Sequence, residues 1–263
     1  MKKADILNKE KIFEKLNNKH TEITLLETVD STNRFLKQNS DNANEWSVVI
    51  AENQTSGRGR YTRKFYSPEN CGIYMSILLK PEISADSAVL VTAAAAVAVS
   101  EAIENLSSKQ TQIKWVNDIF INSKKVCGIL CEGVINAKSG LIDRVILGIG
   151  INVYTPENDF DSSIKDIAGA VFSEEIPDMR NRLIAEVINR FEKYYCELKN
   201  RTFLEGYRSR SAVIGKKITV LRGEEKIPAL ALGIDDNCHL EVEFEDGERE
   251  FLSSGEISIK LKG

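Results

Sequence analysis

Residues 112–151 read QIKWVNDIFINSKKVCGILCEGVINAKSGLIDRVILGIGI, and this stretch sets the fold class that the sequence predicts. It contains three strand-like runs, Gln112–Trp115, Val126–Ile135 and Leu141–Ile151, with short connections such as the turn at residues 122–125. Hairpins between closely spaced strands are typical of antiparallel pairs. The pattern therefore predicts a mixed or largely antiparallel sheet with helices on one face, and not a strict βαβ repeat.

The chain before this stretch is expected to supply more strands and helices of the same sheet. An amphipathic helix is predicted over residues 1–20 and a longer one over Ala85–Leu106. The longest apolar run, at residues 88–99, is too short to cross a bilayer, so we expect a core helix and no membrane. The additional strands are expected at Ile23–Val29, Trp46–Ala51 and Ile73–Leu79.

Two further helices and a group of short strands are predicted after residue 151. Pro177 opens a helical run that ends at Asn200, and a shorter helix is expected over Phe203–Ser211. We expect these helices to close the far side of the sheet. From Ile214 short strands follow one another between turns, which predicts a small barrel. The expected strands are Lys217–Leu221, Ile227–Ile234, Leu240–Phe244, Glu250–Leu252 and Ile257–Leu261.

Composition excludes several classes of function. The chain of 263 residues carries a formal net charge of −4, the opposite of what a dedicated nucleic-acid binder shows. Its five cysteines are scattered and lack CxxC spacing, and it has only two histidines, so neither a disulfide framework, a metal site nor a hydrolytic triad is expected. No apolar run follows the basic N-terminus as in a secretory signal, which favours the cytoplasm.

The strongest functional signal is the run QTSGRGRYTRKFYSP at residues 54–68, directly after a predicted strand. Gly57 and Gly59 let the backbone approach a ligand closely, and four cations lie within seven residues. Because the chain as a whole is acidic, this basic loop predicts an anion-binding site, with a solvated surface loop as the alternative. The cations are Arg58, Arg60, Arg63 and Lys64.

Three other segments could take part in the same site. In Lys114–Ile119 a lysine at a strand end could stabilise phosphate charge, although an exposed hairpin lysine is the plainer interpretation. In Asp30–Asn33 hydroxyl and amide groups could bind a polar ligand or could cap a helix. Gly148–Val153 ends a strand with glycines, which suits either a ligand contact through Asn152 or close backbone packing.

Taken together and in order, five segments of the chain resemble those of the biotin protein ligases. The resemblance spans most of the chain and implies an α+β fold, in which a mixed sheet flanked by helices is related to class II aminoacyl-tRNA synthetases and an SH3-like β-barrel follows. The implied domains are residues 1–212 for catalysis and residues 213–263 for the barrel, without an N-terminal repressor domain. The segments are Asp30–Asn33, Gln54 with Ser56–Arg60, Lys114–Asp118, Lys125–Glu132 and Gly148–Asn152.

The resemblance also implies the reaction. In such ligases the biotin carboxylate attacks the α-phosphate of ATP to give biotinyl-5′-AMP, and a lysine of a biotin carboxyl carrier protein domain then attacks the mixed anhydride. ATP and biotin are therefore the expected substrates, Mg²⁺ is expected with ATP, and no metal site of the protein itself is expected. The expected partner is the carrier domain of a biotin-dependent carboxylase, and the resemblance is compatible with a homodimer.

Roles carry over residue by residue. The resemblance assigns catalysis to Lys114, Arg58 and Arg60, because positioned cations neutralise charge that develops during acyl and phosphoryl transfer. It assigns nucleotide binding to Arg60, Arg63, Asn117 and Asn152. It assigns biotin binding to Ser31, Thr32, Asn33, Gln54, Arg58, Gly59, Arg60, Lys114 and Gly128.

Two rival functions remain at this point. A lipoate protein ligase of related fold is the first, although the Gly-Arg-Gly-Arg loop and the C-terminal barrel favour biotin. A non-enzymatic nucleic-acid-binding regulator is the second. Residues 241–250 of the predicted barrel hold six acidic residues and one basic residue, so the barrel is a poor binder of a DNA groove.

Overall fold

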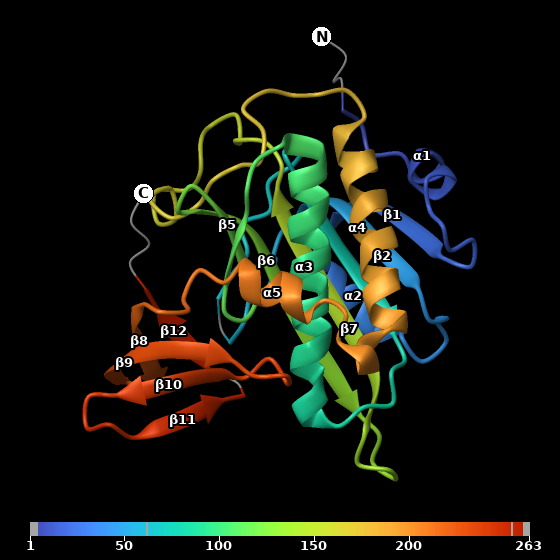
Figure 1. The fold of residues 1–263 in the computed structure, drawn as a ribbon. Helices are drawn as coiled ribbons and strands as arrows, with labels where there is room; N and C mark the ends of the chain where they lie inside the picture. Colours follow the sequence, from blue (N-terminus) through green and yellow to red (C-terminus); the bar gives the residue numbers. More distant parts are fainter. Residues whose placement is uncertain (1–4, 62, 254, 260–263) are drawn as a thin grey trace.

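The computed structural model describes residues 5–61, 63–253 and 255–259, and its fold is drawn in Figure 1. Seven strands form one sheet in the order β1-β2-β3-β7-β6-β5-β4. The pair β1–β2 is parallel and all the other pairs are antiparallel, so the predicted mixed sheet is confirmed. The strands are β1 (Glu22–Val29), β2 (Ser47–Gln54), β3 (Gly72–Leu79), β4 (Gln112–Lys114), β5 (Asp118–Ile121), β6 (Lys124–Ile135) and β7 (Ile142–Asn152).

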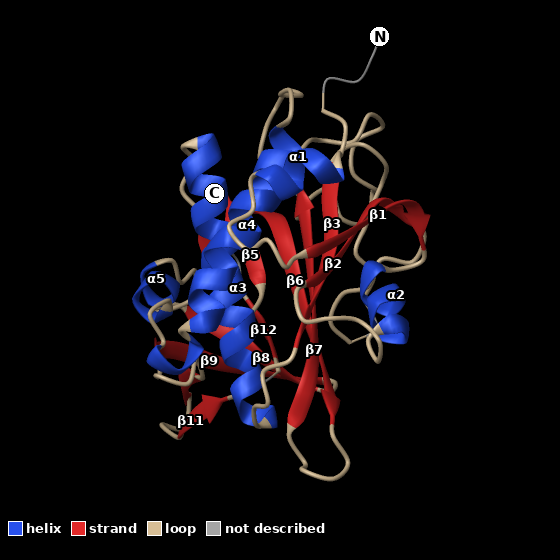
Figure 2. Ribbon diagram, turned by 90° about the vertical axis from the view of Figure 1, so that its right-hand side faces the viewer, coloured by secondary structure: helices blue, strands red, loops and turns tan. Residues whose placement is uncertain are grey.

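Helices cover both faces of this sheet, but the helix after Pro177 does not lie on the far side of the sheet from the Ala85–Leu106 helix, where it was expected. Helices α3 (Ala88–Ser107) and α4 (Met179–Cys196) pack together on one side. Helix α2 (Thr32–Asn39) lies on the other side, where Leu36 packs with Val49, and Figure 2 shows the sheet between them. A helix was expected at residues 34–38, and α2 confirms it, but the sequence did not indicate which face of the sheet it covers. Two short 3₁₀ helices, at Ala85–Ser87 and Leu198–Asn200, precede α3 and follow α4.

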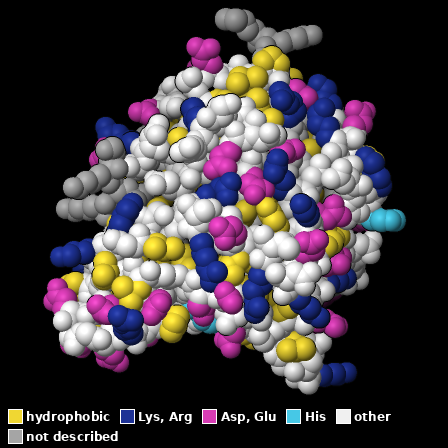
Figure 3. Space-filling view, viewed as in Figure 1, with side chains coloured by type: hydrophobic (Ala, Val, Ile, Leu, Met, Phe, Trp, Pro, Cys, Tyr) yellow, Lys and Arg dark blue, Asp and Glu magenta, His cyan; other side chains and the backbone are white. Residues whose placement is uncertain are grey.

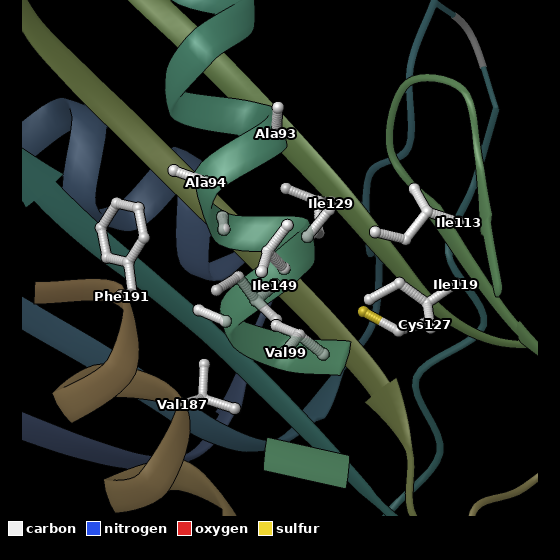
Figure 4. Packing of buried hydrophobic residues seen from close by; sticks show 14 of the residues in the cluster. Ala93, Ala94, Val99, Ile113, Ile119, Cys127, Ile129, Ile149, Val187 and Phe191 are labelled. Atoms are coloured by element: carbon white, nitrogen blue, oxygen red, sulfur yellow. The ribbon is translucent and has the colours of Figure 1, made fainter. Parts of the chain in front are cut away.

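Helix α3 is the centre of the main core, as predicted. Figure 4 shows Ala93, Ala94 and Val99 of α3 between sheet residues and Phe191 of α4. Among the described residues, Ala85–Ser107 is long and apolar enough to cross a membrane, but 72% of its most apolar window is buried inside the protein. Small alanine side chains allow this close packing on several sides at once, so the apolar composition is explained by the core.

The C-terminal part forms a second, entirely antiparallel sheet with the strand order β11-β10-β9-β8-β12. The five predicted strands are all present, and β12 begins at residue 256. The predicted end of that strand, at residues 260 and 261, lies outside the described residues. The bounds are β8 (Lys217–Arg222), β9 (Glu225–Ile234), β10 (Leu240–Phe244), β11 (Arg249–Leu252) and β12 (Glu256–Ser258).

The predicted helix over residues 1–20 is wrong for most of its length. Only α1 (Lys9–Glu14) is helical, with the side chain of Asn8 accepting a hydrogen bond from Lys11 N at its start. The chain before it is held in another way, because the buried carboxylate of Asp5 accepts hydrogen bonds from Tyr154 Oη and Arg180 N. Residues 1–4 of the predicted helix lie outside the described residues. The short helix α5 (Leu204–Ser209) lies where predicted.

Candidate active site

A cleft opens over the sheet beneath the glycine–arginine loop at residues 55–66. Its empty volume, which includes the open mouth, is about 900 Å³. Eleven of the twelve predicted site residues line this cleft, and they come from segments far apart in the chain. These eleven are Ser31, Thr32, Asn33, Gln54, Arg58, Gly59, Arg60, Arg63, Lys114, Asn117 and Gly128.

Strand register aligns the floor of the cleft in one row across five strands. Tyr74 pairs with Gly150, Gly150 with Gly128, Gly128 with Asp118, and Asp118 with Lys114. Residues directly opposite one another on neighbouring strands point to the same face of a sheet. The two glycines stand in the middle of the row beneath the Phe65 ring of the loop, since a Cβ at Gly150 would lie 2.5 Å from that ring and a Cβ at Gly128 would lie 3.2 Å from it. An acidic and a basic side chain stand at the β4 end of the row.

A hydrogen-bonded chain of side chains holds one end of the cleft. Gln54 Oε1 accepts hydrogen bonds from Thr32 N (2.9 Å) and Thr32 Oγ1 (3.2 Å), and Gln54 Nε2 donates to Ser67 Oγ (2.9 Å). Ser31 occupies the N-cap position of α2, but its side chain makes no capping hydrogen bond. The Ser31 hydroxyl therefore does not cap the helix, which was one of the two roles considered for this segment. Ser31 lines the cleft instead.

Two residues that complete this chain were missed by the sequence analysis. Ser76, fully buried in β3, has its Oγ 2.8 Å from Thr32 Oγ1 and 2.5 Å from Asn33 Oδ1. Asn33 Nδ2 donates to Glu132 Oε2 of β6 at 2.9 Å, so both ends of the Asn33 amide are fixed. The one available signal was a serine within the otherwise apolar run of β3.

Gly148 makes room for this arrangement, because a Cβ there would overlap Asn33 Oδ1. We therefore expect Gly148→Ala to push Asn33 from its place and to weaken biotin binding about 10-fold, the effect of about 1–3 kcal/mol of overpacking. Titration calorimetry with biotin measures this. Gly233→Ala is the matched control, since a Cβ at Gly233 would meet only Glu241 Oε2, at 3.9 Å. Unchanged biotin affinity in Gly148→Ala would remove Asn33 from the site.

The glycine–arginine loop is tied to the rest of the protein and is not a solvated surface loop. Arg58 Nη1 donates to Glu132 Oε1 at 3.1 Å. Arg60 Nη2 donates to the carbonyl of Gly255, in the C-terminal sheet, at 2.7 Å, and its Nη1 lies 3.3 Å from Asn117 Oδ1. The arginines thus lie at the cleft, where positive charge is suited to an anionic ligand.

A second lysine of the cleft, Lys125, was assigned no role in the sequence analysis. It lies on β6, and its Nζ is 2.6 Å from Asp118 Oδ1. A Cβ on Gly128 would lie 3.4 Å from the same Nζ, so this ammonium is beside the predicted biotin contact. Lys125 is the first residue of the motif that ends at Glu132, so its place in this motif could have indicated a role, but the resemblance assigned a role only to Gly128 of this motif. Two lysines, Lys114 and Lys125, therefore stand at this end of the cleft.

Asn152 is the predicted site residue that the cleft does not contain. Its Nδ2 donates to the carbonyl of Gly169 at 3.0 Å and lies 3.4 Å from the carbonyl of Lys125. This amide therefore joins the end of β7 to the segment around residue 169. Its assignment to adenine stays a prediction that the geometry does not favour.

The cysteines and acidic residues provide no cluster of metal ligands within the described parts of the chain. Burial raises the pKa of Cys131 to about 12 and that of Cys127 further, so both thiols stay protonated at physiological pH. A protonated thiol is neither a good nucleophile nor a metal ligand. Cys127 serves the core, as predicted, and Asp118 is the acidic side chain of the described cleft lining.

Comparison with known proteins agrees with the fold and the cleft. Residues 25–152 match the Biotin/lipoate A/B protein ligase family, and residues 213–260 match the Biotin protein ligase C terminal domain. The Bifunctional ligase/repressor BirA of Bacillus subtilis is 37% identical over 220 residues, covering 82% of this chain and 67% of that protein. The Biotin--[acetyl-CoA-carboxylase] ligase of Mycobacterium tuberculosis is 28% identical over 220 residues, covering 80% and 77%.

The structural comparison covers nearly the whole chain. The biotin protein ligase of Aquifex aeolicus, solved in complex with biotin and ATP, superposes with a TM-score of 0.72 at 28% identity, covering 92% of this chain and 99% of that one. A mixed sheet that carries a glycine–arginine loop over a lysine-lined cleft, followed by a small β domain, defines a ligase of the biotin and lipoate class. The chain belongs to the biotin protein ligase family. The predicted family, fold class and enzyme class are confirmed.

Proposed function

We propose that the cleft binds biotin and ATP, forms biotinyl-5′-AMP, and transfers the biotinyl group to one lysine of a carboxyl carrier domain. A carboxylate oxygen of biotin attacks the α-phosphorus, and the bond to pyrophosphate breaks. The ε-amine of the carrier lysine then attacks the acyl carbon, AMP leaves with the electron pair of the C–O bond, and the amine loses a proton. The observation that carries this proposal is the gathering of eleven predicted site residues in one cleft.

The polar end of the cleft suits the ureido group of biotin. The described network fixes Thr32, Asn33 and Gln54, and Ser31 adds a hydroxyl that makes no capping bond. Fixed donors and acceptors in a partly apolar pocket orient a small ligand without an ordering cost at each binding event. Gly128 and Gly150 have no side chains, and the Phe65 ring of the loop packs over them. The backbone of Gly128 is therefore proposed to contact biotin beside this ring.

The cationic end suits the carboxylate and the phosphates. Arg58 and Arg60, with the backbone of Gly59 between them, wrap the biotin carboxylate and the α-phosphate. Lys114 stabilises the charge that develops between them, and Lys125 supplies a second ammonium close by. Arg63 and Asn117 contact the nucleotide. Mg²⁺ would accompany the triphosphate, which holds it largely by itself, and Asp118, the acidic residue of the described cleft lining and the ion-pair partner of Lys125, would be the carboxylate to assist.

The experiment that tests this proposal is ATP–pyrophosphate exchange with biotin or lipoate as the acid. We expect exchange that depends on biotin and Mg²⁺, and no exchange above background with lipoate. Exchange with lipoate and not with biotin would establish the first rival function in its place. Exchange with neither acid would contradict the proposed first step.

The C-terminal domain is proposed to support the site as well as the carrier. Besides the Arg60–Gly255 bond, Trp115 Nε1 of the cleft donates to the carbonyl of Cys238 at 2.9 Å. A chain of residues 1–212 is therefore expected to keep the main core but to lose most exchange activity and carrier labelling. Carrier labelling by residues 1–212 at the rate of the full chain would show that the barrel is dispensable.

Binding of nucleic acid is not part of the proposal. On the face in Figure 3 acidic and basic side chains are interspersed and form no broad basic patch. The acidic residues of β10 and β11 are partly paired within the barrel, as in the bond from Arg249 Nε to Glu243 Oε2 at 2.8 Å. A gel shift with duplex DNA at physiological salt is therefore expected to show no complex. We further propose that the chain is a soluble enzyme that works in the cytoplasm.

A further inference from the structure

The turn between β4 and β5, at residues 115–117, presents two cleft residues, because Lys114 precedes it and Asn117 ends it. Its two strands are only three and four residues long, and β4 is the edge of the sheet. A two-stranded hairpin of this length is not stable by itself. Something outside the hairpin must therefore fix the turn.

Three contacts from the C-terminal third of the chain fix the turn at residues 115–117. The segment after α5 extends the sheet, with Ile113 N donating to Arg210 O (2.7 Å) and Ala212 N donating to Ile113 O (2.8 Å). The indole of Trp115, only 3% exposed, donates to the carbonyl of Cys238. The hydroxyl of Tyr207, on α5, donates to the carbonyl of Val116 at 3.0 Å, at a site where the tyrosine is 1% exposed.

The Tyr207 bond is the one that reaches the middle of the turn. Burial raises the pKa of Tyr207 well above its usual range, so the hydroxyl keeps its proton at physiological pH. The carbonyl that accepts this hydrogen bond belongs to the residue before Asn117. The Nδ2 of Asn117 donates to Ile129 O at 2.8 Å. Tyr207 itself does not line the cleft, so it acts through the turn.

We propose that Tyr207 is a positioning residue for biotin activation, which fixes the Trp115–Asn117 turn from α5 so that Lys114 and Asn117 meet ATP correctly. This inference rests on the proposed adenylation in the cleft. Electrostatic catalysis depends on groups that are already in place, so a small displacement lowers the rate more than the binding of biotin. The polar network proposed for the ureido group belongs to β2, α2, β3 and β6, which this contact does not touch.

The test uses Tyr207→Phe in the full chain, with Tyr194→Phe as the matched control. Tyr194 Oη also makes one hydrogen bond, a partly buried one to Glu101 Oε1 at 2.8 Å, but between α4 and α3. We expect kcat for biotin-dependent pyrophosphate exchange to fall about 10-fold in Tyr207→Phe and to stay within about 2-fold in Tyr194→Phe. The dissociation constant for biotin should stay within about 2-fold in both.

Hydrogen exchange of the peptide at residues 112–121 gives a second readout that needs no activity. Its amides should exchange faster in Tyr207→Phe and not in Tyr194→Phe. Normal kcat in Tyr207→Phe, or an equal loss in both variants, would overturn the positioning role. A wild-type chain without pyrophosphate exchange would instead contradict the proposed function. In that case, unchanged hydrogen exchange of residues 112–121 in Tyr207→Phe would overturn the positioning role as well.

Discussion

Replacing Lys114 with alanine is expected to lower biotin-dependent pyrophosphate exchange about 100-fold, because one preorganised charge at a transition state contributes about 3 kcal/mol. The side chain stands at the end of the floor row, opposite Asp118, and is not part of the core. The unfolding temperature should therefore stay close to that of the wild type. Exchange kinetics and thermal unfolding on the same preparation separate the two effects.

Lys125→Ala is the companion variant, and a loss of similar size is expected because its ammonium lies beside Gly128 in the same cleft. Lys80→Ala serves as the control, since Lys80 is an exposed lysine that follows the far end of β3. Exchange at the wild-type rate in Lys114→Ala would remove this residue from the mechanism. A loss confined to Lys125→Ala would transfer the catalytic role to that lysine.

Arg60→Gly is expected to weaken biotin binding and to let biotinyl-AMP escape. The change removes a charge-assisted contact to the ligand, about 1.5–3 kcal/mol or roughly 10- to 100-fold in affinity. It also removes the bonds that tie the loop to Asn117 and Gly255. A loop without these ties no longer shields the reactive anhydride from the solvent.

The escape is measured as biotin on lysines of an unrelated protein such as serum albumin, incubated with enzyme, biotin and ATP. The wild type should label only its carrier, and Arg60→Lys, which keeps the charge, should leak less than Arg60→Gly. If Arg60→Gly binds biotin normally and labels no albumin, this arginine neither binds the substrate nor retains the intermediate.

The fold could be predicted to a large extent because its strands are strongly patterned. The runs that became β6 and β7 lie in the stretch at residues 112–151, and their short connections implied antiparallel pairing. The four residues of β5 were missed as a separate strand, since such a short run has little periodicity. The N-terminal helix was overestimated because the burial of Asp5 against Arg180 depends on residues 175 positions apart.

The candidate site could be predicted where chemistry is concentrated in short motifs, as in the glycine–arginine loop. Ser76 and Tyr207 were beyond reach, because each is one polar residue whose partner is distant in the chain, whereas Glu132 ended one of the motifs but was given no role. Asn152 stays an untested prediction, since its place in a motif suggested a ligand contact while its amide donates to the backbone of Gly169. Tertiary contacts decide such cases, and a single sequence does not contain them.

The most direct test of the central claim is the intact mass of a biotin carboxyl carrier domain after incubation with the chain, ATP and Mg²⁺. The account predicts that the carrier gains one biotinyl group with biotin, gains nothing with lipoate, and gains nothing when its acceptor lysine is replaced by arginine. A carrier that stays unmodified with biotin, or that gains lipoate instead, would contradict it.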